Sequence, residues 1–142
     1  DPRIALLDAG EKLLAAAVPC CTLRLAGLIG PGRHPARFLS GKQAGAADVA
    51  VNMVHSSDIC AAVSAIVEQQ LWPEVYNLSS PEFCSKAEFY LTACELASLP
   101  MPVFDPKSAV PQSRRVSSAK SQTIAGFSYQ FESALAALPF CS

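Results

Sequence analysis

The chain has 142 residues, of which 51% are hydrophobic and 16% are charged, and its formal net charge is −1. This length suits one ordinary domain, and the interspersed acids and bases leave no basic field for a nucleic acid or an anionic membrane. The apolar share is high enough for part of the surface to pack against a partner, although a compact Ala-rich domain explains it equally well.

The first thirty residues predict a helix followed by a strand. Over residues 3–17, apolar side chains recur at helical spacing, at Leu6, Leu7, Gly10, Leu13, Leu14 and Ala17. Pro19 ends the helix, and the apolar run 20–29 predicts a buried parallel strand. Because the helical pattern starts almost at Asp1, we expect upstream sequence to have been removed, with loss of an initiator methionine alone as the alternative.

A long loop and a second strand–helix unit come next. Residues 30–48 lose the pattern in a stretch of Gly, Pro and Arg that is long for a connection inside a compact domain. Residues 49–55 predict a short strand. Ser56-Ser57-Asp58 offers an N-cap for a helix that we expect to end near Gln70.

The last part of the chain predicts one more strand and two helices. Residues 75–78 form the strand, and Ser85 and Glu88 have the spacing of a capping box that opens a helix. A helical turn begins around 116–120, and a short helix covers 132–138. The alternation predicts an α/β fold, the C-terminal part of a Rossmann-like doubly wound sheet whose N-terminal strands are missing.

The cysteines and histidines point away from disulfides and metals. The cysteines, Cys20, Cys21, Cys60, Cys84, Cys94 and Cys141, lie in or beside apolar segments without the spacing of a disulfide framework. We expect reduced thiols and a cytoplasmic protein. The only histidines are His34 and His55, and no C-x-x-C pair exists, so no metal site is predicted. The best apolar stretch, 13–29, is interrupted by Pro19 and Arg24, so we expect no membrane span.

The usual motifs of a dinucleotide enzyme are absent. The glycines of 27–32 have the reverse of the G-x-G-x-x-G spacing and precede a loop. No lysine follows Tyr76, Tyr90 or Tyr129 by four residues, so no tyrosine–lysine acid/base pair exists and no catalytic residue is predicted. We interpret His55 as a hydrogen-bonded structural histidine rather than a general base.

Positive charge gathers after the first strand. Arg33, His34, Arg37 and Lys42 could hold an anionic or hydroxyl-rich ligand, and a solvated loop is an equally good interpretation. Arg114, Arg115 and Lys120 form a second group, for which surface exposure is the better interpretation.

Several segments, in order and spacing, carry a family resemblance. They are Thr22 to Arg33, Val51 to Ile59, Val75 to Leu78, Ser85-x-x-Glu88-Phe89, Arg115 to Lys120 and Gly126-Phe127. Together they resemble the C-terminal half of extended short-chain dehydrogenase/reductases, and in particular NAD(P)-dependent epimerase/dehydratase-like proteins. The resemblance covers nearly the whole chain.

The resemblance implies a site divided between a cofactor wall and a substrate loop. Leu25, Ala26, Gly27 and Leu28 would lie beside the nicotinamide of NAD or NADP in the intact protein, while this chain alone would bind no cofactor. Gly30, Arg33, His34 and Arg37 would border the substrate. His55 and Asp58 match a supportive H-x-x-D element in which Asp58 caps a helix. Val51 stands where many nucleotide-sugar members carry an arginine, so the resemblance gives no reason to expect a nucleotide-sugar substrate.

We therefore predict the substrate-side fragment of an NAD(P)-dependent epimerase, dehydratase or oxidoreductase, inactive alone. Residues 1–30 would complete the Rossmann-like domain, and residues 31–142 would form the substrate-binding region. Its partners would be the missing N-terminal half or a second copy, together with a small-molecule substrate. The alternatives are a non-catalytic Rossmann-like module for ligand sensing or protein interaction, and a self-sufficient α/β domain.

Overall fold

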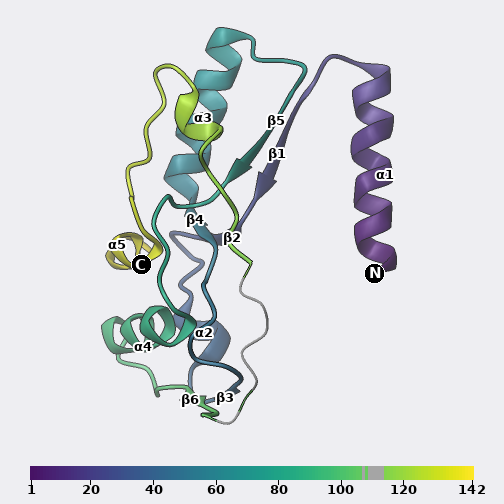
Figure 1. Cartoon of the computed structure of the whole chain (residues 1–142). Helices are drawn as coiled ribbons and strands as arrows, with labels where there is room; N and C mark the ends of the chain where they lie inside the picture. Colours follow the sequence, from purple (N-terminus) through teal and green to yellow (C-terminus); the bar gives the residue numbers. More distant parts are fainter. Residues whose placement is uncertain (107, 109–113) are drawn as a thin grey trace.

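The computed structural model of the chain describes residues 1–106, 108 and 114–142 (Figure 1). The α-helices are α1 (Pro2–Ala17), α2 (Ala36–Leu39), α3 (Ser56–Gln69), α4 (Lys86–Leu96) and α5 (Ala134–Ala137). The strands are β1 (Cys21–Leu25), β2 (Gly27–Ile29), β3 (Gln43–Ala44), β4 (Met53–His55), β5 (Glu74–Leu78) and β6 (Val103–Phe104). Two 3₁₀ turns, η1 (Ser121–Thr123) and η2 (Leu138–Phe140), complete the described part.

The named strands pair in parallel, two by two. β1 pairs with β5, β2 with β4, and β3 with β6, and the chain between paired strands includes helices. Parallel neighbours need such crossover connections. The predicted α/β class with parallel strands is confirmed.

The predicted strand 20–29 is two strands, and this part of the prediction was wrong. The chain changes partner at Ala26: the Ala26 N–H donates to Leu78 O and the next N–H, of Gly27, donates to Asn52 O, both at 2.9 Å. β1 therefore ends beside β5, and β2 starts beside β4. The segment is also less buried than predicted, since Ile29 is fully buried whereas Leu25 is 47% exposed.

Two hydrophobic clusters hold the body together. One lies where α2, α4 and the C-terminal turns meet, around the fully buried Phe89. The other joins α3 to β4 and β5, and its buried side chains include Val54, Ile66 and Leu78. β2 and β4 run between the clusters, because Ile29 belongs to the first and its neighbouring strand supplies Val54 to the second.

Helix α1 stands apart from this body, as Figure 1 shows. None of its residues is buried, and its large apolar side chains, Ile4, Leu6, Leu7, Leu13 and Leu14, are 61–75% exposed. Among the described residues, the side-chain hydrogen bonds from the body to α1 form a bidentate ion pair in which the Arg24 guanidinium donates to Glu11, at 2.6 Å for the shortest bond. A hollow of about 520 Å³ lies between α1 and Arg24.

The helix starts agree with the sequence at α4 and differ at α3. Ser85 Oγ accepts the Glu88 N–H at 3.1 Å and so caps α4, as predicted. At α3 the capping residue is His55, whose Nδ1 accepts the Ser57 N–H at 3.2 Å. Asp58 lies inside the first turn and is buried, so its predicted role as a cap was wrong.

The division at residue 30 stays a prediction. Both strands of the first thirty residues pair with later ones, β1 with β5 and β2 with β4. The segment predicted as a long loop, 30–48, contains α2 and β3. Within the described ranges, no helix is long and apolar enough to cross a bilayer.

Candidate functional site

The carboxyl ends of β1 and β5 lie side by side, because Leu25 and Leu78 are register partners at the end of the pair. Ligands of open α/β sheets bind outside such ends. Leu25 is partly exposed there, Ala26 and Leu28 are half-buried, and Gly27 is exposed. The four residues predicted to face a cofactor therefore form one partly exposed strip at the change of strand partner.

This strip fits one side of a flat ring better than it fits a diphosphate. Its accessible atoms are apolar side chains and backbone. A Cβ on Gly27 would collide with Met53 Sδ and lie 3.1 Å from Asn52 O, so the glycine allows β4 to approach rather than opening space for phosphate. Phosphate sites at helix starts use free N–H groups, whereas the first turn of α3 is capped by His55. In the described part of the chain we find no glycine-rich loop that opens a helix.

The four residues predicted to border the substrate separate into two groups. Gly30 is buried at φ +147°, and its carbonyl accepts the Arg33 N–H at 2.9 Å. Arg33 folds back, donating from Nε to Leu28 O at 3.0 Å with its guanidinium 5.8 Å from the Phe38 ring centroid. His34 and Arg37 instead line a separate cavity of about 470 Å³.

His55 and Asp58 are structural, as their surroundings show. His55 is buried, its Nδ1 lies 2.8 Å from Ser57 Oγ, and its ring packs edge-on against Phe131 with centroids 4.7 Å apart. Asp58 Oδ1 accepts the Gln130 N–H at 2.7 Å. The interpretation of His55 as a hydrogen-bonded structural residue is confirmed.

Burial raises the pKa of Asp58, and the Gln130 N–H and the nearby His55 oppose the rise. Asp58 Oδ2 has no hydrogen-bond partner among the described residues. This carboxyl group therefore anchors the segment at Gln130 to the start of α3, and it is enclosed too completely to meet a substrate.

The tyrosines are buried and unsuited to acid/base work at neutral pH. Burial raises the pKa of Tyr76, Tyr90 and Tyr129. The Tyr129 hydroxyl and Ser121 Oγ are hydrogen-bonded at 2.8 Å, and Lys120 Nζ lies 4.8 Å from the Tyr76 ring centroid. In the described ranges, no three His, Cys, Asp or Glu side chains gather as a metal site.

The sequence analysis did not identify the role of Asn52, which holds the segment around Arg115 in place. Asn52 donates from Nδ2 to Arg114 O at 2.8 Å and accepts the Val116 N–H on Oδ1 at 2.7 Å. It thereby fixes the segment that carries Arg115, whose guanidinium lies 4.9 Å from the Phe83 ring centroid. Nothing in the local pattern around Asn52 signals partners more than sixty residues away.

Comparisons with known proteins found similarity in sequence and in fold. No protein-family model matches the chain. Protein YeeZ of Escherichia coli (strain K12) is 33% identical over 109 residues, 77% of this chain and 40% of the relative. The chain thus spans less than half the length of this curated relative.

Solved structures share the fold. A putative epimerase from Burkholderia cenocepacia J2315 matches with a TM-score of 0.67 and 20% identity, over 94% of this chain and 49% of that one. The Bordetella bronchiseptica enzyme WbmG, in complex with NAD and UDP, matches with a TM-score of 0.63 and 22% identity, over 86% of this chain and 42% of that one.

The chain has the fold of the C-terminal half of NAD(P)-dependent epimerase/dehydratase-like proteins, and the resemblance predicted from the sequence is confirmed as a likeness of fold.

Proposed function

We propose that the chain is the substrate-side part of an NAD(P)-dependent epimerase, dehydratase or oxidoreductase, and that it is inactive alone. The observation that carries the proposal is the partly exposed strip from Leu25 to Leu28 at the carboxyl ends of β1 and β5. A strip at this place in an α/β sheet supplies one wall of a ligand cleft. We place the opposite wall in sequence that precedes Asp1.

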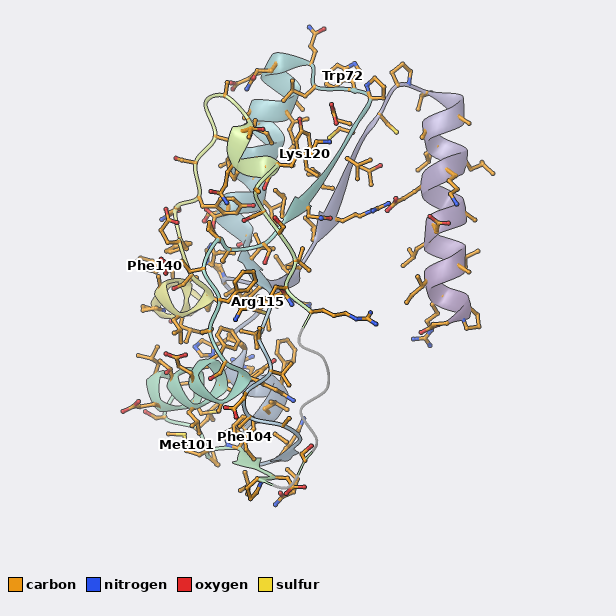
Figure 2. All side chains as sticks on the ribbon, viewed as in Figure 1. Trp72, Met101, Phe104, Arg115, Lys120 and Phe140 are labelled. Atoms are coloured by element: carbon orange, nitrogen blue, oxygen red, sulfur yellow. The ribbon has the colours of Figure 1, made fainter. Side chains whose placement is uncertain are left out.

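The free edge of β1 supports a partner on that side. In the described part of the chain β1 pairs with β5 alone, so its other edge offers unpaired backbone groups. Beside it an apolar groove of about 270 Å³ is lined by Cys21, Leu23, Val63, Ile66, Val67 and Trp72. Figure 2 shows Trp72 in the connection between α3 and β5. A further strand with its own side chains would satisfy the edge and fill the groove.

The exposed face of α1 supports the same partner or a second copy of the chain. Covering its five large apolar side chains at about 25 cal/mol per Å² would contribute several kcal/mol, more than the single exposed ion pair to Arg24. We therefore propose the missing N-terminal half, or self-association, as what α1 packs against.

NAD or NADP would supply hydride transfer to or from a carbon that bears a hydroxyl or carbonyl group. Leu25, Ala26, Gly27 and Leu28 would contact the nicotinamide side of the cofactor and exclude water there. Gly30 and Arg33, which adjoin the strip at Leu28, would border a small-molecule substrate. The same expectation for His34 and Arg37, which line a separate cavity, stays a prediction. The acid/base group would come from the preceding half, since the three tyrosines of this chain are buried. The free cysteines suit a cytoplasmic protein.

The test compares the full-length protein with this chain alone. Titration with NADH and NADPH, followed by nicotinamide fluorescence, should give saturable binding to the full-length protein and none to the chain. In the full-length protein, Leu25→Glu should weaken cofactor binding at least about tenfold, because it places a carboxylate against the ring. Met101→Glu is the matched control, since Met101 is 46% exposed and lies outside the strip.

The outcomes separate the proposals. Turnover by the isolated chain would disprove its inactivity. Equal cofactor binding by Leu25→Glu and Met101→Glu would contradict the proposal that the strip contacts the cofactor. Cofactor binding without oxidation or reduction of any carbonyl or hydroxyl substrate would favour the sensing module.

A further inference from the structure

We propose that the cavity between α2, the end of α4 and the C-terminal turn binds a small organic carboxylate with an apolar body, at a site separate from the cofactor strip. The cavity measures about 470 Å³, within the usual range for small-molecule sites. It is lined by Gly32, His34, Arg37, Leu96, Ala97, Leu99, Leu138, Pro139, Cys141 and Ser142. None of these side chains is acidic.

His34 lines the cavity and carries one fixed hydrogen-bond donor. Its Nδ1 accepts the Ala36 N–H at 3.3 Å, so the neutral ring carries its proton on Nε2. Burial, and then the charge of Arg37, lower the pKa of His34. The ring is therefore neutral at pH 7, with an N–H that has no partner among the described residues.

Arg37 supplies the charge. Within the described ranges, no hydrogen bond or ion pair engages its guanidinium, whereas the neighbouring Arg33 is held by Leu28 O and the Phe38 ring. A free guanidinium fork matches the two oxygens of a carboxylate. The separation of Arg33 from Arg37 thus leaves one cation available to this cavity.

The remaining wall is apolar and chemically inert. Leu99 and Leu138 give it a hydrocarbon surface, and Leu138 is 1% exposed. Cys141 donates its thiol proton to Ala137 O at 3.4 Å, and burial raises the pKa of this thiol, so it stays protonated. One guanidinium, one N–H donor and a hydrocarbon wall favour a carboxylate on an apolar body over a bare phosphate, which needs more donors.

The cavity is distinct from the strip proposed for the cofactor. None of its lining residues belongs to Leu25–Leu28, and β2 carries the chain away from Leu25 before Gly32 is reached. The four residue-to-residue steps from Leu25 to Ile29 span at most about 13 Å of extended chain. Figure 2 shows Phe140, in the C-terminal turn, on the side of the body away from α1. The proposal rests on this cavity and does not require the proposed function.

The test is calorimetric titration of the full-length protein with 3-phenylpropionate, with its neutral amide as the isosteric probe. We expect one-site binding of the carboxylate and much weaker binding of the amide. Arg37→Gln should weaken carboxylate binding at least about tenfold, and the matched Arg33→Gln should leave it within about twofold. His34→Gln, which keeps an N–H donor, should bind better than His34→Leu.

Unchanged thermal unfolding of Arg37→Gln will show that the exposed residue was not needed for folding. Binding should be the same with saturating NADPH, and inorganic phosphate should not displace the carboxylate. Equal binding of acid and amide, equal losses in Arg33→Gln and Arg37→Gln, displacement by phosphate, or competition with NADPH would each overturn the proposal. Failure of the protein to bind NADPH at all would count against the proposed function and leave this site standing.

Discussion

Gly30 shapes the turn between the strip Leu25–Leu28 and the loop that carries Arg33 and Arg37. Its φ of +147° lies in a region that L-residues rarely adopt, and a Cβ there would collide with Ser56 Oγ and lie 3.5 Å from His55 Nε2. Gly32 also has a positive φ, +74°, but a Cβ there would meet nothing within 4 Å. Alanine substitutions at the two positions therefore distinguish the cost of backbone strain, which both share, from the cost of steric collision, which arises only at Gly30.

Gly30→Ala should lower the free energy of unfolding by about 2 kcal/mol or more, from strain and collision together. Gly32→Ala, the matched control, should cost about 1 kcal/mol from strain alone. Urea unfolding followed by circular dichroism measures both. Equal losses would mean that the contact of Gly30 with Ser56 does not constrain the turn.

Asp58 makes stability depend on pH in a defined direction. The pKa of Asp58 is raised in the folded protein. Above about pH 4 the unfolded chain has released this proton, whereas the folded protein keeps it until the pH exceeds the raised pKa. Stability from this group is therefore greatest below this pH range and falls as pH rises through it.

Asp58→Asn should remove this fall while keeping an oxygen for the Gln130 N–H. Its stability relative to the natural chain should increase from pH 4 to pH 7, as measured by urea unfolding at matched ionic strength. Asp58→Ala also lacks the carboxyl group and should follow the same pH trend. It leaves the Gln130 N–H unpaired and should therefore be less stable than Asp58→Asn by about 1–3 kcal/mol at every pH. A constant difference between Asp58→Asn and the natural chain would contradict the raised pKa.

The sequence predicted those helices and strands whose formation depends on residues close together in the chain. The helical periodicity of 3–17 and the serine cap of α4 were readable because their partners are a few residues away. The break at Ala26 was not readable, because it depends on two distant carbonyl groups, that of Leu78 at the end of β5 and that of Asn52 just before β4. The candidate site was predictable to the same extent. The family resemblance suggested the strip Leu25–Leu28, whereas the different surroundings of Arg33 and Arg37 depend on contacts with Phe38 and with the distant end of α4.

The outer face of α1 gives a prediction for the element as a whole. At about 100° per residue, Leu6 and Leu13 lie on the side of the helix roughly opposite Glu11, which contacts Arg24. We expect the isolated chain to self-associate through this face. Leu6→Lys with Leu13→Lys should shift it to a monomer without lowering its unfolding free energy, since both side chains are more than 70% exposed.

Sedimentation velocity measures this association. The control places the same two charges on exposed positions of α3, Ala61→Lys with Ser64→Lys, and should leave association unchanged. A natural chain that sediments as a monomer, and whose α1 face makes no contact in the full-length protein either, would contradict a docking role for α1.

At the scale of the molecule, the chain has a body with two cores and a helix that belongs to neither. The cores around Phe89 and Leu78 share the β2–β4 pair, so α2 to α5 form one unit. The chain matches slightly less than half the length of the similar solved structures. The high apolar share of the sequence is thus explained in part by α1 and the groove beside β1.

The detached position of α1 also determines how fast its backbone amide hydrogens exchange with solvent. A helix with no buried residue opens at little cost in free energy, so its amides should exchange with deuterium far faster than those of α3 and α4 in the isolated chain. In the full-length protein the same amides should become slow once the face is covered. The exchange rate of α1 would therefore report whether its apolar face is covered in the full-length protein.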